Sequence, residues 1–163
     1  MKNIFITGGN RGIGKGLAEI FSENNKVFFS ARDEHKAKSV IESIGNENID
    51  YVIMDVEDER NVLNGIESLK EKTDSIDILI NNAGILIPGL KHKIDAVETD
   101  DESILKTFNI NTVGVLRVCK AVLPMMRPSS RIINISSGMG QMEGMTTGSI
   151  AYRLSKSALN ALT

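Results

Sequence analysis

Tyr152 and Lys156 stand four residues apart in a stretch that we expect to be helical, and together they could transfer a proton. Residues four apart share one face of a helix. A phenol has a pKa of about 10 and is a poor acid or base at neutral pH, but a nearby ammonium group favours the phenolate and lowers that pKa. The pair therefore suits acid–base chemistry at a substrate oxygen. Taken alone, the same spacing also fits an ordinary pair on a helix surface.

A second candidate site lies near the start of the chain, where Thr7–Gly14 reads TGGNRGIG. Glycines at such a turn permit a tight bend and the close approach of a pyrophosphate, and the helix that follows offers free N–H groups. The spacing is Gly-x-x-x-Gly-x-Gly rather than Gly-x-Gly-x-x-Gly. Between an apolar run and an amphipathic stretch, it predicts a nucleotide-binding turn.

The elements that must position these residues alternate along the chain. Short apolar runs predict strands at Lys2–Thr7, Lys26–Ala31, Ile49–Met54, Ile76–Asn81 and Arg131–Ser136. Helical spacing predicts helices at Gly12–Glu23, Asp33–Ile44, Asp58–Thr73 and Ser103–Met126. This order predicts an α/β fold, a doubly wound parallel sheet with helices on both faces.

Local signals refine this picture. In the first helix, Ile13, Leu17, Ile20 and Phe21 form one stripe that we expect to be buried. Asp33 and Asp58 are the expected N-caps of the next two helices. Residues 85–101 and 138–150 lack periodicity and are expected to be loops, the first with one helical turn.

Taken in order, these motifs resemble the short-chain dehydrogenase/reductase family. The resemblance rests on Thr7–Gly14, Asp55-Val56, Asn81-Asn82-Ala83-Gly84, Asn111, Ser137 and Tyr152-x-x-x-Lys156. It covers nearly the whole chain and implies a Rossmann-like NAD(P)-binding fold. The implied cofactor-binding residues are Gly8, Asn10, Arg11, Gly12, Ile13, Gly14, Arg32, Asp55, Val56, Asn82, Ala83, Gly84, Tyr152 and Lys156.

The resemblance also implies a reaction, hydride transfer between the dinucleotide and a small carbonyl or alcohol substrate. The implied catalytic residues are Asn111, Ser137, Tyr152 and Lys156. Ser137 is expected at a strand end, where it would hold the substrate oxygen against the phenol. Lys156 would also bind the nicotinamide ribose, and Asn111 would support a proton-relay water.

The preferred coenzyme can be argued from the end of the second strand. An acid there would accept hydrogen bonds from a free ribose 2′-hydroxyl, but the expected position is Ala31. Arg32 follows it and Arg11 stands in the glycine turn, so two guanidinium groups could face a 2′-phosphate. These residues favour NADP(H) over NAD(H). Two alternatives stay open: Arg32 only stacks on adenine, or Asp33 is the ribose acid.

Composition excludes several other classes of protein. The 163 residues carry a net charge of −2 with no basic block, which argues against nucleic acid as a partner. No run approaches the ~18 apolar residues of a membrane span. Cys119 is the single cysteine, so no internal disulfide can form and a cytoplasmic location is expected. His35 and His92 have no partners at ligand spacing, and no metal site is expected.

The sequence ends at Thr163, about two turns into the helix that carries Tyr152. By resemblance we expect residues 1–163 to form one NAD(P)-binding domain that is incomplete at its C-terminus and lacks the last strands. Arg131–Ser136 would then be an exposed edge, and Ser103–Met126 is apolar beyond one stripe. Both features predict a homodimer or higher homo-oligomer. The alternative to an enzyme is a nucleotide-binding fragment without turnover.

Overall fold

The computed structural model describes residues 1–87, 96–143 and 147–163. Five parallel strands form one sheet in the order β3-β2-β1-β4-β5. The strands are β1 (Asn3–Ile6), β2 (Lys26–Ala31), β3 (Ile49–Ile53), β4 (Ile76–Asn81) and β5 (Met126–Asn134). The helices are α1 (Gly12–Ser22), α2 (Glu34–Ile44), α3 (Glu59–Lys70), α4 (Asp101–Phe108), α5 (Gly114–Val122) and α6 (Ile150–Leu162). The doubly wound α/β fold predicted from the sequence is confirmed.

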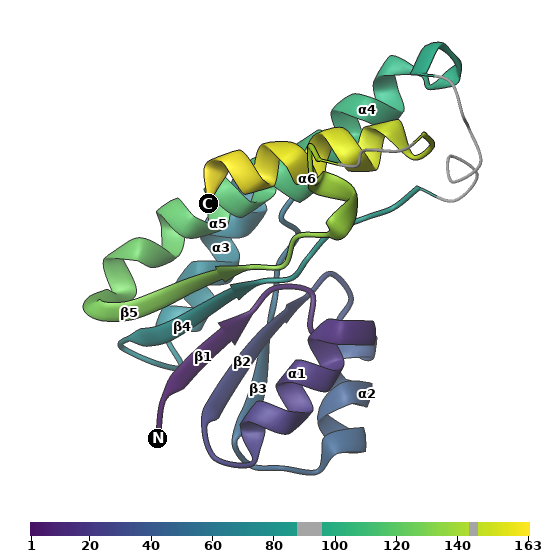
Figure 1. The fold of residues 1–163 in the computed structure, drawn as a ribbon. Helices are drawn as coiled ribbons and strands as arrows, with labels where there is room; N and C mark the ends of the chain where they lie inside the picture. Colours follow the sequence, from purple (N-terminus) through teal and green to yellow (C-terminus); the bar gives the residue numbers. More distant parts are fainter. Residues whose placement is uncertain (88–95, 144–146) are drawn as a thin grey trace.

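Helices cover both faces of the sheet, as Figure 1 shows. One core cluster joins α3 and α5 to Phe5, Phe28 and Leu79. The other joins α1 and α2 to Ile4, Phe29 and their neighbours on the opposite face. Since the central strands are buried on both faces, their near-continuous apolar runs are explained.

The first helix differs from the predicted stripe. Leu17 and Phe21 pack against the core, but Ile13 and Ile20 are 67% and 63% exposed. The buried face of α1 consists instead of the small residues Gly14, Ala18 and Ser22. Small side chains let α1 lie close to the sheet, so its apolar residues flank the contact rather than fill it.

The caps of the next two helices are as predicted. Asp33 accepts a hydrogen bond from the Lys36 backbone N–H, and Asp58 accepts one from the Asn61 backbone N–H. Each carboxylate satisfies a donor that the first helical turn leaves free.

The predicted long helix Ser103–Met126 is wrong in its bounds and in its continuity. The helical stretch begins at Asp101 and is interrupted by a π-helix at Asn109–Val113. It ends in a 3₁₀ turn at Leu123–Met125, where Pro124 cannot continue the hydrogen-bond ladder. Spacing alone does not reveal the π-helix, since it adds a residue within one turn.

The last strand is longer than predicted but regular only in its second half. Its residues from Arg131 to Asn134 pair in register with β4, after an irregularity that follows Met126. Pro128 lies in the irregular part. Ile132 and Ile133 are 38% and 42% exposed, in keeping with the expected exposed edge.

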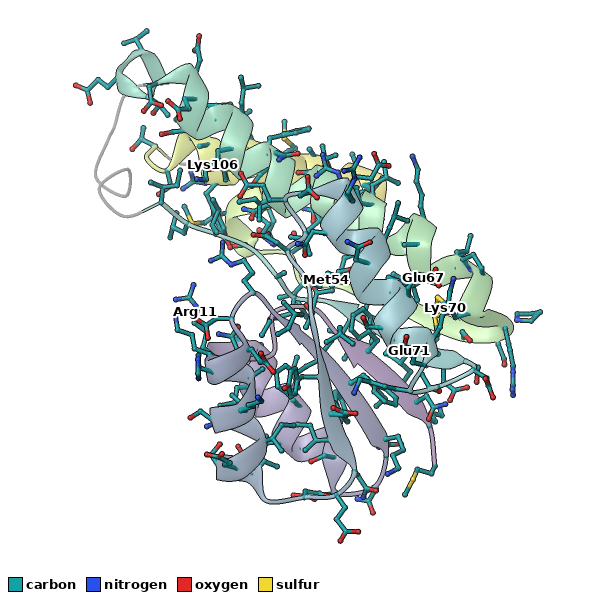
Figure 2. The ribbon with its side chains drawn as sticks, turned by 180° about the vertical axis from the view of Figure 1, so that it is seen from behind. Arg11, Met54, Glu67, Lys70, Glu71 and Lys106 are labelled. Atoms are coloured by element: carbon teal, nitrogen blue, oxygen red, sulfur yellow. The ribbon has the colours of Figure 1, made fainter. Side chains whose placement is uncertain are left out.

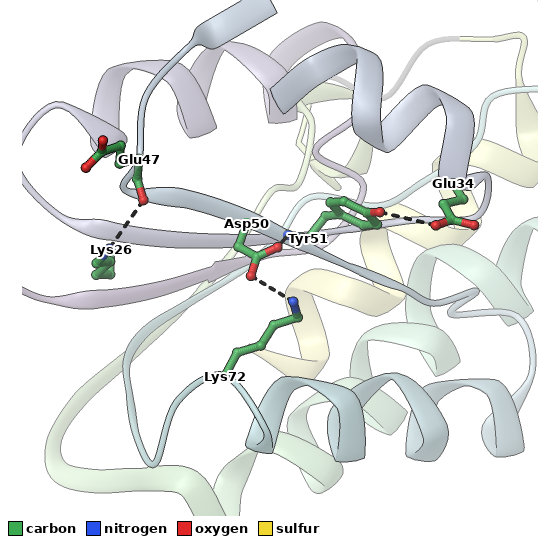
Figure 3. A network of polar contacts seen from close by, with 6 residues as sticks. All are labelled: Lys26, Glu34, Glu47, Asp50, Tyr51 and Lys72. Carbon is green, nitrogen blue, oxygen red and sulfur yellow. Dashed lines mark hydrogen bonds and ion pairs between the residues drawn. The ribbon is translucent and has the colours of Figure 1, made fainter. Parts of the chain in front are cut away.

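Figure 3 draws surface ion pairs and hydrogen bonds around β3, and two of them lie at the amino ends of the strands. Lys72 pairs with Asp50 at 2.7 Å, and Lys26 donates to the backbone carbonyl of Glu47 at 3.3 Å. Exposed pairs of this kind contribute little to stability. The chemistry is to be sought at the opposite, carboxyl ends.

Candidate functional site

A cavity of about 510 Å³ lies at the carboxyl ends of the strands. The chain winds from β1 outward to β3 and then returns to the other side of β1 with β4, so the cavity stands where the strand order reverses. Ligands of doubly wound folds bind at this place. We call it the switch-point cavity. Its lining includes Gly8, Asn10, Arg11, Gly12, Ile13, Arg32, Asp55, Val56, Asn82, Ala83 and Gly84, all predicted from the sequence.

The glycine turn needs its glycines for two different reasons. Gly8 and Gly12 have φ angles of 68° and 55°, a region that side chains disfavour. A β-carbon on Gly12 would meet nothing within 4 Å, so its backbone is accessible to a ligand. Gly14 does not line the cavity. A β-carbon there would overlap the carbonyl oxygen of Gly8 and the side-chain amide of Asn82.

The end of β4 clamps this turn in place. The Thr7 hydroxyl oxygen accepts hydrogen bonds from the backbone N–H groups of Asn82 and Ala83, both at 3.0 Å. The Asn82 amide in turn donates to the carbonyl oxygens of Thr7 and Gly8, also at 3.0 Å. Asn82 therefore acts on the turn itself, while Ala83 and Gly84 continue the cavity wall.

One side of the cavity is rich in charge. Arg11, labelled in Figure 2, lines it together with Arg32 and Lys36. Arg32 Nη1 lies 3.7 Å from Asp55 Oδ2, and the two side chains are 62% and 31% exposed. The Lys36 side chain was not predicted from the sequence. Lys36 could have been found from its position, because it lies in the first turn of α2, and α2 starts beside the glycine turn.

Asp33 also lines the cavity, but its carboxylate is engaged locally. Oδ1 accepts the Lys36 backbone N–H at 2.9 Å. That hydrogen bond holds the pKa of Asp33 below its usual value. Ala31, the last residue of β2, is buried and carries no polar group.

The predicted Tyr–Lys pair lies on α6. The Lys156 ammonium is 5.8 Å from the centroid of the Tyr152 ring. It donates to the Ile135 carbonyl oxygen at 2.7 Å, and the residue is only 4% exposed. Burial lowers the pKa of Lys156. A β-carbon on Gly84 would lie 3.8 Å from the ammonium, which places Lys156 beside one wall of the switch-point cavity.

Asn111 is fully buried within the π-helix and holds two segments together. Its Oδ1 accepts the Ile85 backbone N–H at 2.8 Å, and its Nδ2 donates to the Ile85 carbonyl at 2.9 Å. Nδ2 also donates to Ser155 Oγ at 3.0 Å. Both N–H groups of the amide are thus used, so within this side chain only Oδ1 could accept a hydrogen bond from a relay water.

The sequence predicted Ser137 at the end of a strand, but the structure places it three residues beyond β5. The strand ends at Asn134, and Ser137 caps the 3₁₀ turn Gly138–Gly140 by accepting the Met139 backbone N–H at 3.2 Å. The turn packs closely on α6, because a β-carbon on Gly140 would lie 2.7 Å from the Lys156 carbonyl carbon. The turn that Ser137 caps therefore fixes Ser137 against α6, the helix that carries Tyr152.

Among residues 1–87, 96–143 and 147–163, no helix has the length and apolar character needed to cross a membrane. No group of three or more His, Cys, Asp or Glu side chains that could bind a metal ion occurs there either. His92 lies outside the described residues.

Comparison with known proteins assigns the chain to a class. The model of the short chain dehydrogenase family matches residues 2–163. The chain is 34% identical to secoisolariciresinol dehydrogenase of Forsythia intermedia over 165 residues, covering 99% of this chain and 58% of that protein. It is 36% identical to oxidoreductase UcpA of Salmonella typhimurium over 168 residues, covering 99% of this chain and 61% of that protein.

Solved structures agree with these relatives. The crystal structure of gox2181 superposes with a TM-score of 0.87 at 28% identity, covering 99% of this chain and 63% of that chain. The Pseudomonas aeruginosa RhlG/NADP active-site complex gives the same TM-score and identity, with 99% and 64% covered. The chain belongs to the short-chain dehydrogenase family. It spans about three-fifths of the length of the relatives named here.

Proposed function

We propose that this protein is an NADP(H)-dependent oxidoreductase that acts on a small carbonyl or alcohol substrate. One observation carries the proposal: Lys156 and Tyr152 lie together on α6, with the ammonium beside the Gly84 wall of the switch-point cavity. A nucleotide site and a proton-transfer pair thus adjoin each other. Membership in the short-chain dehydrogenase family supports the same reaction class.

The residues present fit a dinucleotide. The open space at Gly12 leaves room for a pyrophosphate against the glycine turn, where the α1 N-terminus favours anions. In this proposal Gly8, Asn10, Gly12 and Ile13 hold the pyrophosphate, and Gly14 supports the turn from behind. Asp55 and Val56 contact adenine, Asn82, Ala83 and Gly84 adjoin the nicotinamide half, and Lys156 binds its ribose. When bound, the dinucleotide supplies or accepts the hydride.

The chain's own residues then manage the proton. During carbonyl reduction, the Tyr152 hydroxyl donates its proton to the substrate oxygen, and during alcohol oxidation the phenolate accepts it. The Lys156 ammonium stabilises the phenolate. The Ser137 hydroxyl donates a hydrogen bond to the substrate oxygen and orients it. Asn111 contributes through Oδ1 and through its hold on Ile85 and Ser155.

The preference for NADP(H) rests on charge. Arg11, Arg32 and Lys36 line the cavity, and Ala31 offers no carboxylate to a ribose hydroxyl. The cap of α2 engages Asp33 Oδ1, which argues against Asp33 as the ribose acid. The Arg32–Asp55 pair is exposed and long, so turning Arg32 toward a 2′-phosphate costs little. The relative RhlG was solved as an NADP complex.

Fluorescence titration with NADPH and NADH tests the coenzyme. A charge-assisted contact is worth roughly 1.5–3 kcal/mol, so Arg32→Ala should weaken NADPH about tenfold or more and NADH much less. Arg60→Ala, on the exposed surface of α3, is the matched control and should change neither affinity. Equal affinity of the unaltered protein for both coenzymes would refute the preference.

Oxidation of NADPH in the presence of a panel of ketones and aldehydes tests the activity. Turnover with any member supports the enzyme. Tight NADPH binding without turnover would favour the alternative, a nucleotide-binding chain that performs no chemistry by itself. The substrate is proposed only as a class.

We further propose a homo-oligomer, most simply a dimer, in a reducing cytoplasm. Leu116 and Leu123 on and beside α5 are 36% and 59% exposed, and Leu105 and Phe108 on α4 are exposed as well. Together with the exposed β5 residues Ile132 and Ile133, they are apolar side chains that a second subunit could cover. A reducing compartment suits the lone thiol of Cys119, whose pKa burial raises.

A further inference from the structure

Arg153 follows Tyr152 on α6, yet its side chain is buried and only 8% of the residue is exposed. Its Nε donates to the Gly148 carbonyl oxygen at 2.8 Å. Nη2 lies 3.4 Å from the Thr147 carbonyl oxygen and Nη1 lies 3.5 Å from that of Met139. A guanidinium stays charged at all ordinary pH values, and its burial is tolerated only with hydrogen-bond partners. Backbone carbonyls meet that need here.

These carbonyls belong to two separate segments. Met139 lies in the turn that follows Ser137, and the other two residues directly precede α6. Arg153 therefore contacts both ends of the connection between β5 and α6. The Nε contact is the short one, and the two longer contacts are weaker.

The turn in front of α6 has a backbone that needs support. Gly148 has a φ angle of 85°, and Ser149 has one of 53° although it is not a glycine. Ser149 is buried, and its side chain makes no capping hydrogen bond to α6. Such conformations persist when neighbouring groups hold them. The Arg153 Nε–Gly148 contact is such a restraint.

Other side chains of α6 hold the first segment alone. Ser157 Oγ and Asn160 Nδ2 donate to the Gly140 carbonyl oxygen at 3.1 and 3.0 Å. They fix the turn after Ser137 against the helix but do not reach residues 147 and 148 through any contact described. Arg153 adds the link between this turn and the start of α6.

We propose that Arg153 is a positioning residue: it keeps the Ser137 turn and the first turn of α6 in one arrangement, and so sets the Tyr152 phenol relative to the Ser137 hydroxyl. Arg153 is not among the residues that line the switch-point cavity, and its three contacts given above are with backbone carbonyl oxygens. The catalytic part of this inference rests on the proposed function.

The chain allows a direct test without turnover. It contains two tyrosines and no tryptophan, so Tyr51→Phe leaves Tyr152 as the single phenol. Labelled with fluorotyrosine, this background should give one narrow fluorine NMR line. Arg153→Met, which keeps the bulk but loses the donors, should shift and broaden it. Arg153→Lys should restore it in part, since it keeps the charge without the planar fork. Leu154→Ala, at a 48% exposed neighbour, should leave it unchanged.

Turnover supplies the second arm. A small misplacement of reacting groups can cost up to about a hundredfold, so Arg153→Met should lower kcat roughly tenfold or more, with NADPH affinity and KM within about twofold. An unchanged fluorine line overturns the proposal. So does a parallel loss of NADPH affinity or of the folded state in both Arg153 variants, which would indicate a general structural role. If the unaltered protein turns over no substrate, the proposed function fails, while the NMR comparison still decides whether Arg153 positions Tyr152.

Discussion

The glycine turn after β1 and the connection before α6 are held in place by different kinds of contact. In the turn, backbone groups and the short side chains of Thr7 and Asn82 make the contacts, and glycines leave the space. In front of α6, long side chains reach across to carbonyl oxygens, Arg153 to Gly148 and Lys156 to Ile135. Both regions flank the same proposed site.

The difference decides what each region tolerates. A turn made of backbone fails when any β-carbon is added at a close approach. A connection held by long side chains fails when a single donor is removed, although the chain around it can stay folded. The first region is therefore fragile toward added bulk, and the second toward lost polarity.

The largest expected effect concerns α5 and the residues that directly follow it, and it is an effect on folding and assembly. Val118 on α5 is fully buried in the core, so Val118→Glu should abolish folding, because an unpaired buried charge costs on the order of 3–5 kcal/mol. Leu123→Glu, at an exposed position, should leave the fold intact and shift the protein to monomer. Circular dichroism and light scattering at low micromolar concentration measure both. A soluble monomer before any substitution would contradict the proposed oligomer.

Next in size is the loss of the phenol. Tyr152→Phe should reduce turnover by about 10²–10⁴-fold, since it removes the proton donor and keeps the ring. NADPH affinity should stay within about twofold, as measured by fluorescence titration. Appreciable remaining turnover would mean that another group supplies the proton.

A smaller effect distinguishes two glycines of the same helix. Gly14→Ala should destabilise the protein by about 1–3 kcal/mol and weaken NADPH, because the methyl group would push against Gly8 and Asn82. Gly16→Ala meets nothing within 4 Å and should stabilise α1 by up to about 1 kcal/mol. Urea unfolding of both variants measures the contrast. If both behave alike, the tight packing behind the turn is refuted.

The smallest effect is a dependence on pH. Burial lowers the pKa of Lys156 below its ordinary value of 10.5, so between the folded and unfolded pKa values the unfolded chain binds more protons. The contribution of Lys156 to stability should therefore be lowest below the folded pKa and rise as pH increases toward 10.5. Urea unfolding between neutral pH and pH 10 should show the free energy of unfolding of the unaltered protein rising relative to that of Lys156→Met. A constant difference would contradict the shift.

Regular features of this molecule were readable from its sequence. Buried parallel strands need apolar residues at nearly every position, and each of the five predicted runs overlaps one of the five strands. The fifth differs most in its bounds, because β5 spans Met126–Asn134 rather than Arg131–Ser136. Glycine marks backbone close approach, which is why the turn could be predicted, whereas the resemblance to the family implied most of the other residues of the switch-point cavity. The residues Asp33 and Asp58 cap their helices as expected because capping is a local interaction.

Features that depend on distant contacts were not readable. Ile13 and Ile20 follow helical spacing but lie exposed, since the small face of α1 packs on the sheet instead. Lys36 reaches the cavity only because the end of β2 adjoins the glycine turn. Arg153 reads as a surface residue between Tyr152 and Lys156, and only its burial against carbonyl oxygens reveals a role.

The π-helix at Asn109–Val113 has a consequence for how this chain tolerates changes in length. A π-helix fits one more residue into its turn than an α-helix does. Removing one residue between 109 and 113 would let the helix run without interruption and leave α4 and α5 in nearly the same rotational register, but it would change the direction of the side chains within that turn. Asn111 would then leave Ile85 and Ser155 without their amide partner. In this stretch a more regular helix would be a less functional one, so here a one-residue deletion should be tolerated by the fold far better than by the proposed reaction.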